Sequence, residues 1–338
     1  MSQAERYSRQ TVLKEIGAAG QKRLLDSRVL VVGCGALGCT QAQLLARAGV
    51  GTLRLVDRDF VELSNLQRQL LFDEDDVASR LPKAEAAARK LRRVNSAIQI
   101  EGLVTDLTPR NALELVASSD IVLDATDNLE TRYLLNDASV KLGKPWIYGG
   151  AVGSSGVLLP VVPGEGPCLR CLFGEPPPPG TLPTCDLLGV LNTAPALVAT
   201  LQVTEALRLL LGEPARPRVV TADLWDLSVR RVEVARDPAC RCCGERRFDF
   251  LDAVETSTAT SLCGRNAVQL SPARACKLDL EALATRLAEA GSVAGNGFLL
   301  QFETGEHEIV VFADGRAIVR GTSDPAVARS LYARWIGS

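Results

Sequence analysis

Short apolar runs alternate with longer stretches of helical periodicity over the first 150 residues. The apolar runs occupy residues 29–32, 52–56, 98–104, 120–125 and 145–150. Apolar residues recur at helical spacing over residues 36–48, 83–94 and 129–142. Because strands that alternate with helices form parallel sheets covered by helices on both faces, this pattern predicts an α/β fold.

The pattern changes after residue 150. Residues 156–162 and 218–234 are strand-like, and only residues 193–211 show helical spacing between them. Strands without an intervening helix pair antiparallel, so we expect added antiparallel strands at one end of the sheet. Residues 174–191 are rich in proline, which predicts a loop rather than a helix or a central strand.

A polar stretch at residues 255–261 predicts a linker, with a first domain over residues 1–254 and a small α/β accessory domain over residues 262–338. The accessory domain shows a strand pattern at 267–270 and a helical pattern at 280–290. Three short strands are expected across 298–321, followed by a closing helix at 325–336.

Composition excludes several classes of protein. The chain has 38 Lys and Arg against 40 Asp and Glu, so it lacks the broad positive field that nucleic acids or anionic membranes attract. Its apolar runs are shorter than the roughly 18 residues of a membrane span, and its first residues lack the apolar stretch of a signal peptide. We therefore expect a cytoplasmic protein with no nucleic-acid or membrane partner.

A glycine motif follows the first predicted strand. Gly33, Gly35 and Gly38 form G-x-G-x-x-G before a helical stretch, where bare backbone and a helix N-terminus can approach phosphate groups. Asp57 comes at the end of the next strand, about 20 residues on, where a carboxylate binds ribose hydroxyls. The motif predicts a Rossmann-like sheet that binds a nucleotide or dinucleotide.

Charged residues further along the chain favour ATP over a dinucleotide. Asn65, Arg68 and Lys83 are candidates to hold the three phosphates of ATP, and Asp59 and Asp127 are candidates to hold or orient Mg²⁺. Each of these side chains taken alone could equally belong to a solvated charged face. An NAD-dependent oxidoreductase remains an alternative, although it would have no use for the cationic side chains.

Two Cys-x-x-Cys pairs predict a metal site. Cys168 and Cys171 form one pair, and Cys240 and Cys243 form the other. Four thiolates suit a tetrahedral zinc ion with no open position, so the zinc would be structural. Cys242 could compete with Cys240, but the spacing of Cys240 and Cys243 fits better.

Cys185 lies in the proline-rich loop just before a helical stretch. An accessible thiolate in that setting could act as a nucleophile, or the residue could be a spectator thiol.

Taken together, the segments RYSRQ, GCGALG, DRDFVELSNLQRQ, PKAEAA and DATDN and the two cysteine pairs resemble the ThiF/MoeB/HesA family. These adenylyltransferases activate ubiquitin-like sulfur-carrier proteins. The resemblance implies that the three glycines, Asp57, Asn65, Arg68 and Lys83 bind ATP and that Asp127 is linked to Mg²⁺. It also implies a homodimer, with Arg9 reaching into the neighbouring subunit's site, and the same four zinc ligands.

The reaction implied by the resemblance is attack of a carrier's C-terminal glycine carboxylate on the α-phosphate of ATP. Pyrophosphate leaves and a carrier acyl-adenylate forms, with no general base because a carboxylate is already ionised at neutral pH. Sulfur would then arrive from a cysteine desulfurase or through Cys185. The carriers of thiamin and molybdopterin synthesis, among others, are possible substrates. One alternative is a bacterial ubiquitin-like activating enzyme that forms a thioester, and another is a non-catalytic scaffold. The accessory domain is expected to serve docking or dimerisation.

Overall fold

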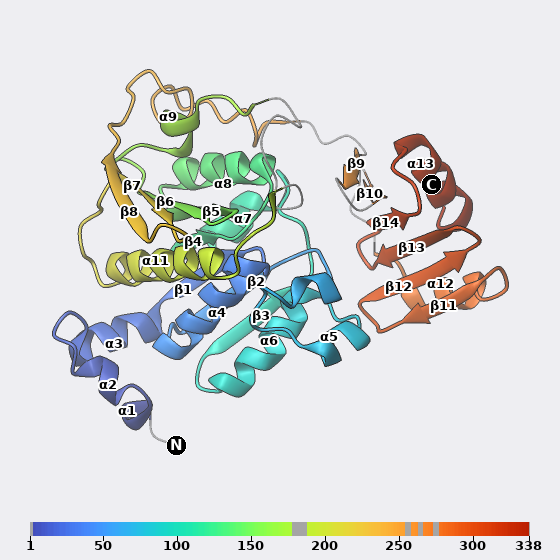
Figure 1. Ribbon diagram of the computed structural model, residues 1–338, viewed down its shortest axis with the longest axis horizontal. Coiled ribbons are helices and arrows are strands. Elements are labelled where there is room, and N and C mark those ends of the chain that lie inside the picture. Colours follow the sequence, from blue (N-terminus) through green and yellow to red (C-terminus); the bar gives the residue numbers. More distant parts are fainter. Residues whose placement is uncertain (1–2, 178–187, 254–257, 263–265, 273–276, 338) are drawn as a thin grey trace. The chain divides into compact units, whose positions relative to one another are not determined.

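The computed structural model describes residues 3–177, 188–253, 258–262, 266–272 and 277–337. The chain divides into two compact units, Met1–Ala253 and Val254–Ser338. Figure 1 labels the helices and strands of both. No helix in the described part of the chain is both long and apolar enough to cross a lipid bilayer.

An eight-stranded sheet forms the centre of the first unit, in the order β3-β2-β1-β4-β5-β6-β7-β8. Its parallel strands are β1 (Arg28–Val32), β2 (Thr52–Val56), β3 (Gln99–Leu103), β4 (Ile121–Asp124) and β5 (Trp146–Val152). Its antiparallel strands are β6 (Ser155–Val161), β7 (Arg218–Asp223) and β8 (Ser228–Glu233). The predicted α/β fold with added antiparallel strands is confirmed.

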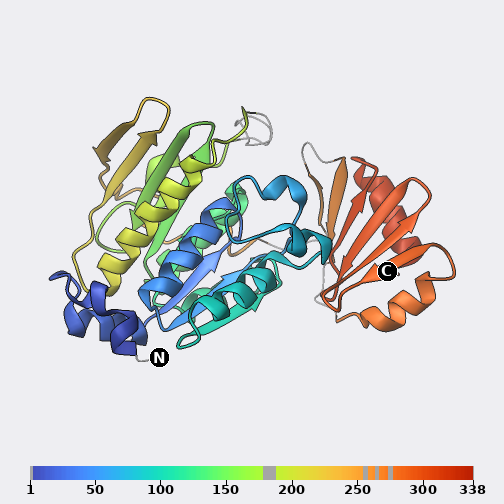
Figure 2. The same cartoon turned by 60° about the horizontal axis from the view of Figure 1, so that its bottom comes forward.

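Helices cover both faces of this sheet, because alternate residues of β1 point to opposite sides. Val29 and Val31 pack with α4 (Ala36–Ala48), α6 (Lys83–Val94) and α11 (Thr193–Leu210). Leu30 and Val32 pack with α7 (Ala112–Ala117), α8 (Leu129–Leu142) and α9 (Leu169–Phe173). In Figure 2 the blue α4 and the yellow-green α11 lie on one face of the sheet, and the two helices contact each other.

Shorter helical elements complete the first unit. They are α1 (Gln3–Arg6), α2 (Ser8–Thr11), α3 (Gly17–Asp26), the 3-10 turn η1 (Leu63–Asn65) and α5 (Glu74–Ala78). The segment between β2 and η1 is tied to the start of α6, because the N–H of Lys83 donates to the carbonyl oxygen of Asp59 at 2.8 Å. This segment contains several of the residues that the sequence singled out.

The second unit is a six-stranded antiparallel sheet in the order β11-β12-β13-β14-β10-β9. Its strands are β9 (Thr258–Leu262), β10 (Ala267–Ser271), β11 (Ser292–Gly295), β12 (Leu299–Thr304), β13 (His307–Phe312) and β14 (Ala317–Arg320). Helices α12 (Leu280–Leu287) and α13 (Pro325–Trp335) pack on this sheet through a core that includes Phe302 and Val311.

Strand β9 corrects the interpretation of residues 255–261 as a linker. Residues 258–262 pair with β10 instead. The segment is rich in threonine, serine and alanine, a composition that also occurs in linkers, but an edge strand is held by backbone hydrogen bonds and needs no apolar pattern. The strand β11, which lies at the other edge of the sheet, was missed for the same reason.

Candidate functional site

The glycine turn between β1 and α4 leaves open space over the start of α4. Gly33 has a φ of 96°, and a Cβ there would lie 2.6 Å from the carbonyl oxygen of Ala125. A Cβ on Gly38 would lie 1.9 Å from the carbonyl oxygen of Gly33, so packing requires both glycines. Gly35 differs, because a Cβ there would meet no atom closer than 4.0 Å. The protein itself therefore tolerates a side chain at Gly35, and the space beside it suits a ligand.

Asp57 follows β2 and is hydrogen-bonded to the glycine turn. Its Oδ2 accepts from the backbone N–H of Cys34 at 2.6 Å, and its Oδ1 accepts from the backbone N–H of Asp59 at 2.7 Å. Burial raises the pKa of Asp57, an effect that the charge of Lys83 opposes. The carboxylate is thus fixed beside the start of α4, with lone pairs left for a ligand hydroxyl.

Lys83 is a buried cation at the first residue of α6. Its side chain is 7% exposed, and its Nζ lies 3.2 Å from Asp59 Oδ2. Burial alone would lower the pKa of Lys83, but the charges of Asp59, Asp57 and Asp127 outweigh that effect and raise it. Lys83 therefore stays protonated and keeps donors for an anion.

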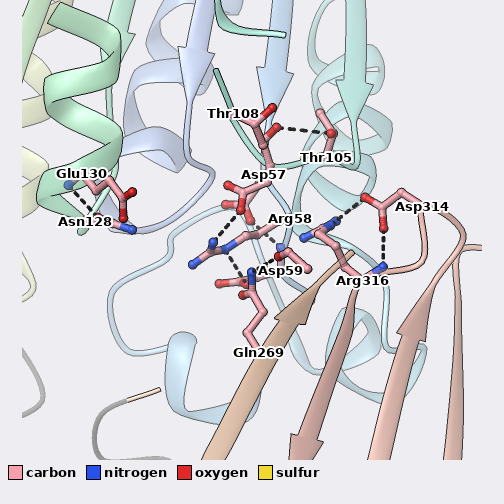
Figure 3. Close-up of polar contacts among 12 residues, drawn as sticks. Asp57, Arg58, Asp59, Thr105, Thr108, Asn128, Glu130, Gln269, Asp314 and Arg316 are labelled. Carbon is pink, nitrogen blue, oxygen red and sulfur yellow. Dashed lines mark hydrogen bonds and ion pairs between the residues drawn. The ribbon is translucent and has the colours of Figure 1, made fainter. Parts of the chain in front are cut away.

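Arg58 joins this cluster and was not singled out by the sequence analysis. Its Nη1 donates to Asp106 Oδ2 at 2.7 Å, and its Nε lies 3.8 Å from Asp59 Oδ1. Figure 3 shows Arg58 between Asp57 and Asp59. In the sequence, the only sign of a role for Arg58 was its position next to Asp57. Its partner Asp106 follows a different strand and gave no such sign.

Asp127 lies exposed in the segment between β4 and α8. Its charge acts on both Lys83 and Arg58, raising the pKa of each. The next residue, Asn128, caps α8, since its Oδ1 accepts from the backbone N–H of Glu130 at 2.8 Å, as Figure 3 shows. The carboxyl ends of β1, β2 and β4 thus bring Asp57, Asp127 and the glycine turn to one edge of the sheet.

A buried ion pair holds the segment that carries Asp127, and the sequence analysis missed it. Arg132 Nε lies 3.1 Å from Asp124 Oδ2, and the Asp124 side chain is 0% exposed. Asp124 Oδ1 also accepts from the backbone N–H of Thr126 at 2.9 Å and from its hydroxyl at 2.7 Å. Arg132 Nη2 donates to the carbonyl oxygens of Thr126 and, at 3.2 Å, Gly149. These bonds fix the backbone immediately before Asp127.

Asn65 and Arg68 belong to the turn that begins with η1. Asn65 is 1% exposed, and its Oδ1 accepts from the backbone N–H of Glu62 at 3.1 Å, which closes the turn. Arg68 is half-buried, and its Nη1 donates to the carbonyl oxygen of Ser64 at 2.9 Å. The Asn65 oxygen is therefore used within the protein, and its amide nitrogen is the end suited to an anion.

Arg9 lies exposed on α2, at the far end of α4 from the glycine turn. Its neighbour Gln10 donates from Nε2 to the carbonyl oxygen of Ala48, the last residue of α4, at 2.8 Å. On the other side, the Tyr7 hydroxyl accepts from Asn95 Nδ2 at 2.8 Å. A helix of 13 residues spans about 20 Å, so the structure does not bring Arg9 to the turn of its own chain.

Four cysteines form a cluster that can hold one metal ion. Their sulfur atoms all lie within 4.8 Å of one another; the residues are Cys168, Cys171, Cys240 and Cys243. The sulfurs of Cys171 and Cys243 are 3.4 Å apart, and those of Cys168 and Cys240 are 3.6 Å apart. Tetrahedral zinc with bonds of about 2.3 Å to sulfur separates its ligands by about 3.8 Å, so the four sulfurs fit this metal.

Cys242 does not belong to this group of four, and its sulfur accepts from Asn136 Nδ2 at 3.2 Å in the core. Asn136 Oδ1 accepts in turn from the backbone N–H of Leu169, which ties α8 to α9. Cys185, the predicted candidate nucleophile, lies outside the described residues.

Residues 7–242 match the ThiF family. The chain belongs to the ThiF family. The resemblance drawn from the sequence motifs is confirmed, and the match ends before the second unit begins.

Two relatives differ in how much of this ThiF family chain they match. A Bacillus subtilis (strain 168) protein named sulfur carrier protein ThiS adenylyltransferase is 47% identical over 335 residues, which cover 98% of this chain and 99% of that protein. A Haloferax volcanii protein named SAMP-activating enzyme E1 is 44% identical over 256 residues, or 75% of this chain and 94% of its own length. The first relative therefore has a counterpart of the second unit.

Two solved structures are similar to this chain in fold. The crystal structure of E. coli MccB with ATP has a TM-score of 0.62 and 26% identity, and it covers 71% of this chain and 74% of its own. The crystal structure of E. coli MccB with MccA-N7isoASN has a TM-score of 0.63 and 25% identity, with 72% and 75% coverage.

Proposed function

We propose that this protein is an ATP-dependent adenylyltransferase that activates the C-terminal carboxylate of a sulfur-carrier protein. The observation that carries this proposal is the 47% identity to a sulfur carrier protein ThiS adenylyltransferase over 98% of the chain. The buried cation beside the glycine turn supports it independently, because a dinucleotide does not require Lys83. The MccB structure solved with ATP supports the choice of nucleotide.

In this proposal the nucleotide lies along the carboxyl edge of the sheet. Asp57 binds the ribose, and Gly35 leaves room for the phosphate next to it, in a turn whose packing requires Gly33 and Gly38. Lys83 and the side chains of Asn65 and Arg68 hold the remaining phosphates; the donor groups that these residues keep support this role.

Mg²⁺ would be held near the exposed Asp127, with Asp59 as a second carboxylate, and it would neutralise phosphate charge when bound. Asp59 already pairs with Lys83 and Arg58. In this proposal Asp59 would orient the ion or its waters while it stays paired with these cations.

The reaction joins a carrier carboxylate oxygen to the α-phosphorus of ATP and breaks the bond from that phosphorus to pyrophosphate. The carrier's terminal glycine carries the attacking carboxylate, which is ionised at neutral pH and needs no base. The protein's contribution is to align the two reactants and to offset the charge on the leaving pyrophosphate. Lys83 and Arg68 supply that charge in this chain.

The carrier is of the ThiS type in this proposal, and a molybdopterin-type carrier is the alternative. The counterpart of the second unit in the B. subtilis relative supports ThiS, since the H. volcanii relative matches only 75% of this chain. The outer sulfur of a persulfide on a cysteine desulfurase then bonds to the acyl carbon of the acyl-adenylate, and AMP leaves. The second unit would dock the carrier or the desulfurase, in addition to the carrier contacts proposed next for the first unit.

The carrier would dock on the hairpin formed by β7 and β8 at the edge of the sheet. Apolar side chains are exposed there, with Trp225 79%, Leu227 87% and Val229 58% exposed. An edge strand with exposed apolar side chains suits a small protein that brings its own sheet. The resemblance to the ThiF/MoeB/HesA family implies that the sulfur carrier is a small ubiquitin-like protein of this kind.

A homodimer is also proposed, with Arg9 completing the site of a second copy. Arg9 lies at the far end of α4 from its own glycine turn, and its neighbours Val12 and Leu13 are 81% and 51% exposed. Exposed apolar side chains beside Arg9, which does not reach the glycine turn of its own chain, support an interface at α2.

The cysteine cluster is proposed to hold a structural zinc ion. Four thiolates leave no position for a substrate. The ion would tie α9 to the segment after β8 and so stabilise the antiparallel end of the sheet.

A second candidate function is thioester formation between a ubiquitin-like protein and Cys185. The relative named SAMP-activating enzyme E1, at 44% identity, favours it. A carrier adduct that survives denaturation but is released by thiol, and is lost in Cys185→Ala, is the expected result for this candidate.

Exchange of labelled pyrophosphate into ATP tests the proposed function. Exchange should require Mg²⁺ and a carrier that ends in Gly-Gly, and a ThiS-type carrier should support it better than a molybdopterin-type one. Lys83→Met should abolish exchange, whereas Lys90→Met is the matched control, because Lys90 lies on the same helix and pairs with Asp76 at 2.7 Å. ATP binding without carrier-dependent exchange would contradict the proposal.

A further inference from the structure

The backbone of Gln69 is fixed next to the nucleotide-binding edge. Its N–H donates to the carbonyl oxygen of Asn65 at 2.9 Å, and its own carbonyl accepts from the N–H of Phe72 at 3.1 Å. The residue is 4% exposed. The turn that also carries Asn65 and Arg68 therefore fixes the position of the Gln69 backbone and the direction in which its side chain leaves it.

The oxygen end of the Gln69 side-chain amide is not satisfied by the fold. Its Oε1 is buried and has no hydrogen-bond partner among the residues that the structure describes. The fold therefore does not hold the amide by its oxygen, and because a phosphate oxygen only accepts, the Nε2 end is the one that can bond to an anion. The buried Gln21 shows the usual arrangement, since its Nε2 donates to the carbonyl oxygen of Ala48 at 3.1 Å and its Oε1 accepts from Gln10 at 2.7 Å.

The amide of Gln69 faces the open space at the start of α4. Its Nε2 lies 4.0 Å from the point where a Cβ on Gly35 would be. Gly35 caps the 13-residue α4, whose first N–H groups favour an anion. Cys34, the residue before it, donates to Asp57 at 2.6 Å. An amide donor, a helix N-terminus and the carboxylate assigned to the ribose thus border one small region.

We propose that Gln69 Nε2 donates a hydrogen bond to the α-phosphate of the bound nucleotide. The inference rests on the proposed function, because it takes the ribose to be at Asp57. The α-phosphate is the phosphate bonded to the ribose, and the bond between Cys34 and Asp57 places the glycine turn beside that ribose. The donor therefore contacts the phosphorus group that the carrier carboxylate attacks, in ATP and in the acyl-adenylate alike.

Gln69→Leu and Gln69→Glu test this assignment by calorimetric titration with ATP and with AMP. Leucine removes the amide, and glutamate keeps its shape but replaces the donor with an anionic acceptor. Loss of a hydrogen bond to a charged group predicts that Gln69→Leu binds both nucleotides about tenfold or more weakly, and Gln69→Glu should bind them more weakly still. Gln21→Leu, in a buried glutamine away from the turn, should bind both as the wild type does.

Thermal unfolding separates a ligand contact from a structural role. Gln69→Leu should leave the Tm of the free protein unchanged or higher, because it removes an unpaired buried oxygen, and it should shrink the rise in Tm that AMP causes. A lower Tm of the free variant with unchanged AMP affinity would overturn the inference. So would a loss confined to ATP, which would put the donor at the β- or γ-phosphate.

The same titrations keep the two proposals distinct. Wild-type protein that binds ATP and AMP but shows no carrier-dependent exchange would contradict the proposed function, while the Gln69 variants would still decide the α-phosphate contact. Wild-type protein that binds neither nucleotide would overturn both.

Discussion

Removal of Arg132 should destabilise the first unit strongly. Arg132→Met leaves the carboxylate of Asp124, which is 0% exposed, without its cation at 3.1 Å. Loss of one partner of a buried ion pair costs about 3–5 kcal/mol. For a unit of this size, about 2–4 °C of Tm per kcal/mol predicts a fall of roughly 6–20 °C. The methionine also releases the carbonyl oxygens of Thr126 and Gly149, so the segment before Asp127 should loosen.

Urea denaturation at two pH values measures this effect. Burial raises the pKa of Asp124, and Arg132 opposes that rise, so the variant should have a still higher folded-state pKa. When the pKa of a carboxyl is higher in the folded state than its unfolded value of about 3.9, the free energy of unfolding falls as pH rises through the folded-state pKa. The deficit of Arg132→Met should therefore be smaller at about pH 5 than at about pH 8.

Two control variants separate the buried ion pair from an exposed one. Asp124→Asn combined with Arg132→Met should recover most of the loss, because no buried charge remains. Arg28→Met breaks an exposed pair at 3.0 Å to Asp120 and should leave the urea midpoint close to that of the wild type. A loss below about 1 kcal/mol in Arg132→Met, or no recovery in the double variant, would contradict the account.

Three further predictions concern the turn, the metal and the partner. Gly35→Ala should fold with a Tm near that of the wild type but bind ATP about tenfold or more weakly, whereas Gly38→Ala should fail to fold, because a Cβ there meets backbone at 1.9 Å; circular dichroism and calorimetry distinguish the two. Cys171→Ser should lose the one zinc ion per chain that elemental analysis should find, and Cys242→Ser should retain it; zinc lost from both would contradict the assignment of ligands. Trp225→Ala should weaken carrier binding at unchanged ATP affinity in titrations, and equal carrier affinity would remove the β7–β8 hairpin from the docking surface.

The fold of the first unit could be predicted because its signals are local. Periodicity located β1, α4 and β2, and the glycine spacing placed Asp57 at the end of the second strand. Parallel strands share a carboxyl edge, so the convergence of Asp57, Asp127 and Lys83 follows from the topology. The metal cluster could be predicted for the same reason, because the spacing within each cysteine pair is a local feature of the sequence.

Other parts of the site depend on contacts between distant segments. Nothing near Arg58 in the sequence indicates Asp106, and nothing near Asp124 singles out Arg132 from other arginines on helices. The polar edge strand β9 lacks the apolar alternation that identifies strands in a sequence. The unpaired oxygen of Gln69 is a property of packing alone.

Intact-mass measurement of the carrier tests the central claim most directly. After incubation with this protein, ATP and Mg²⁺, a ThiS-type carrier ending in Gly-Gly should gain one adenylyl group at its C-terminal carboxylate, and a carrier without the last glycine should gain none. An unmodified carrier in the presence of bound ATP, or an adenylyl group at any other position, would contradict the account.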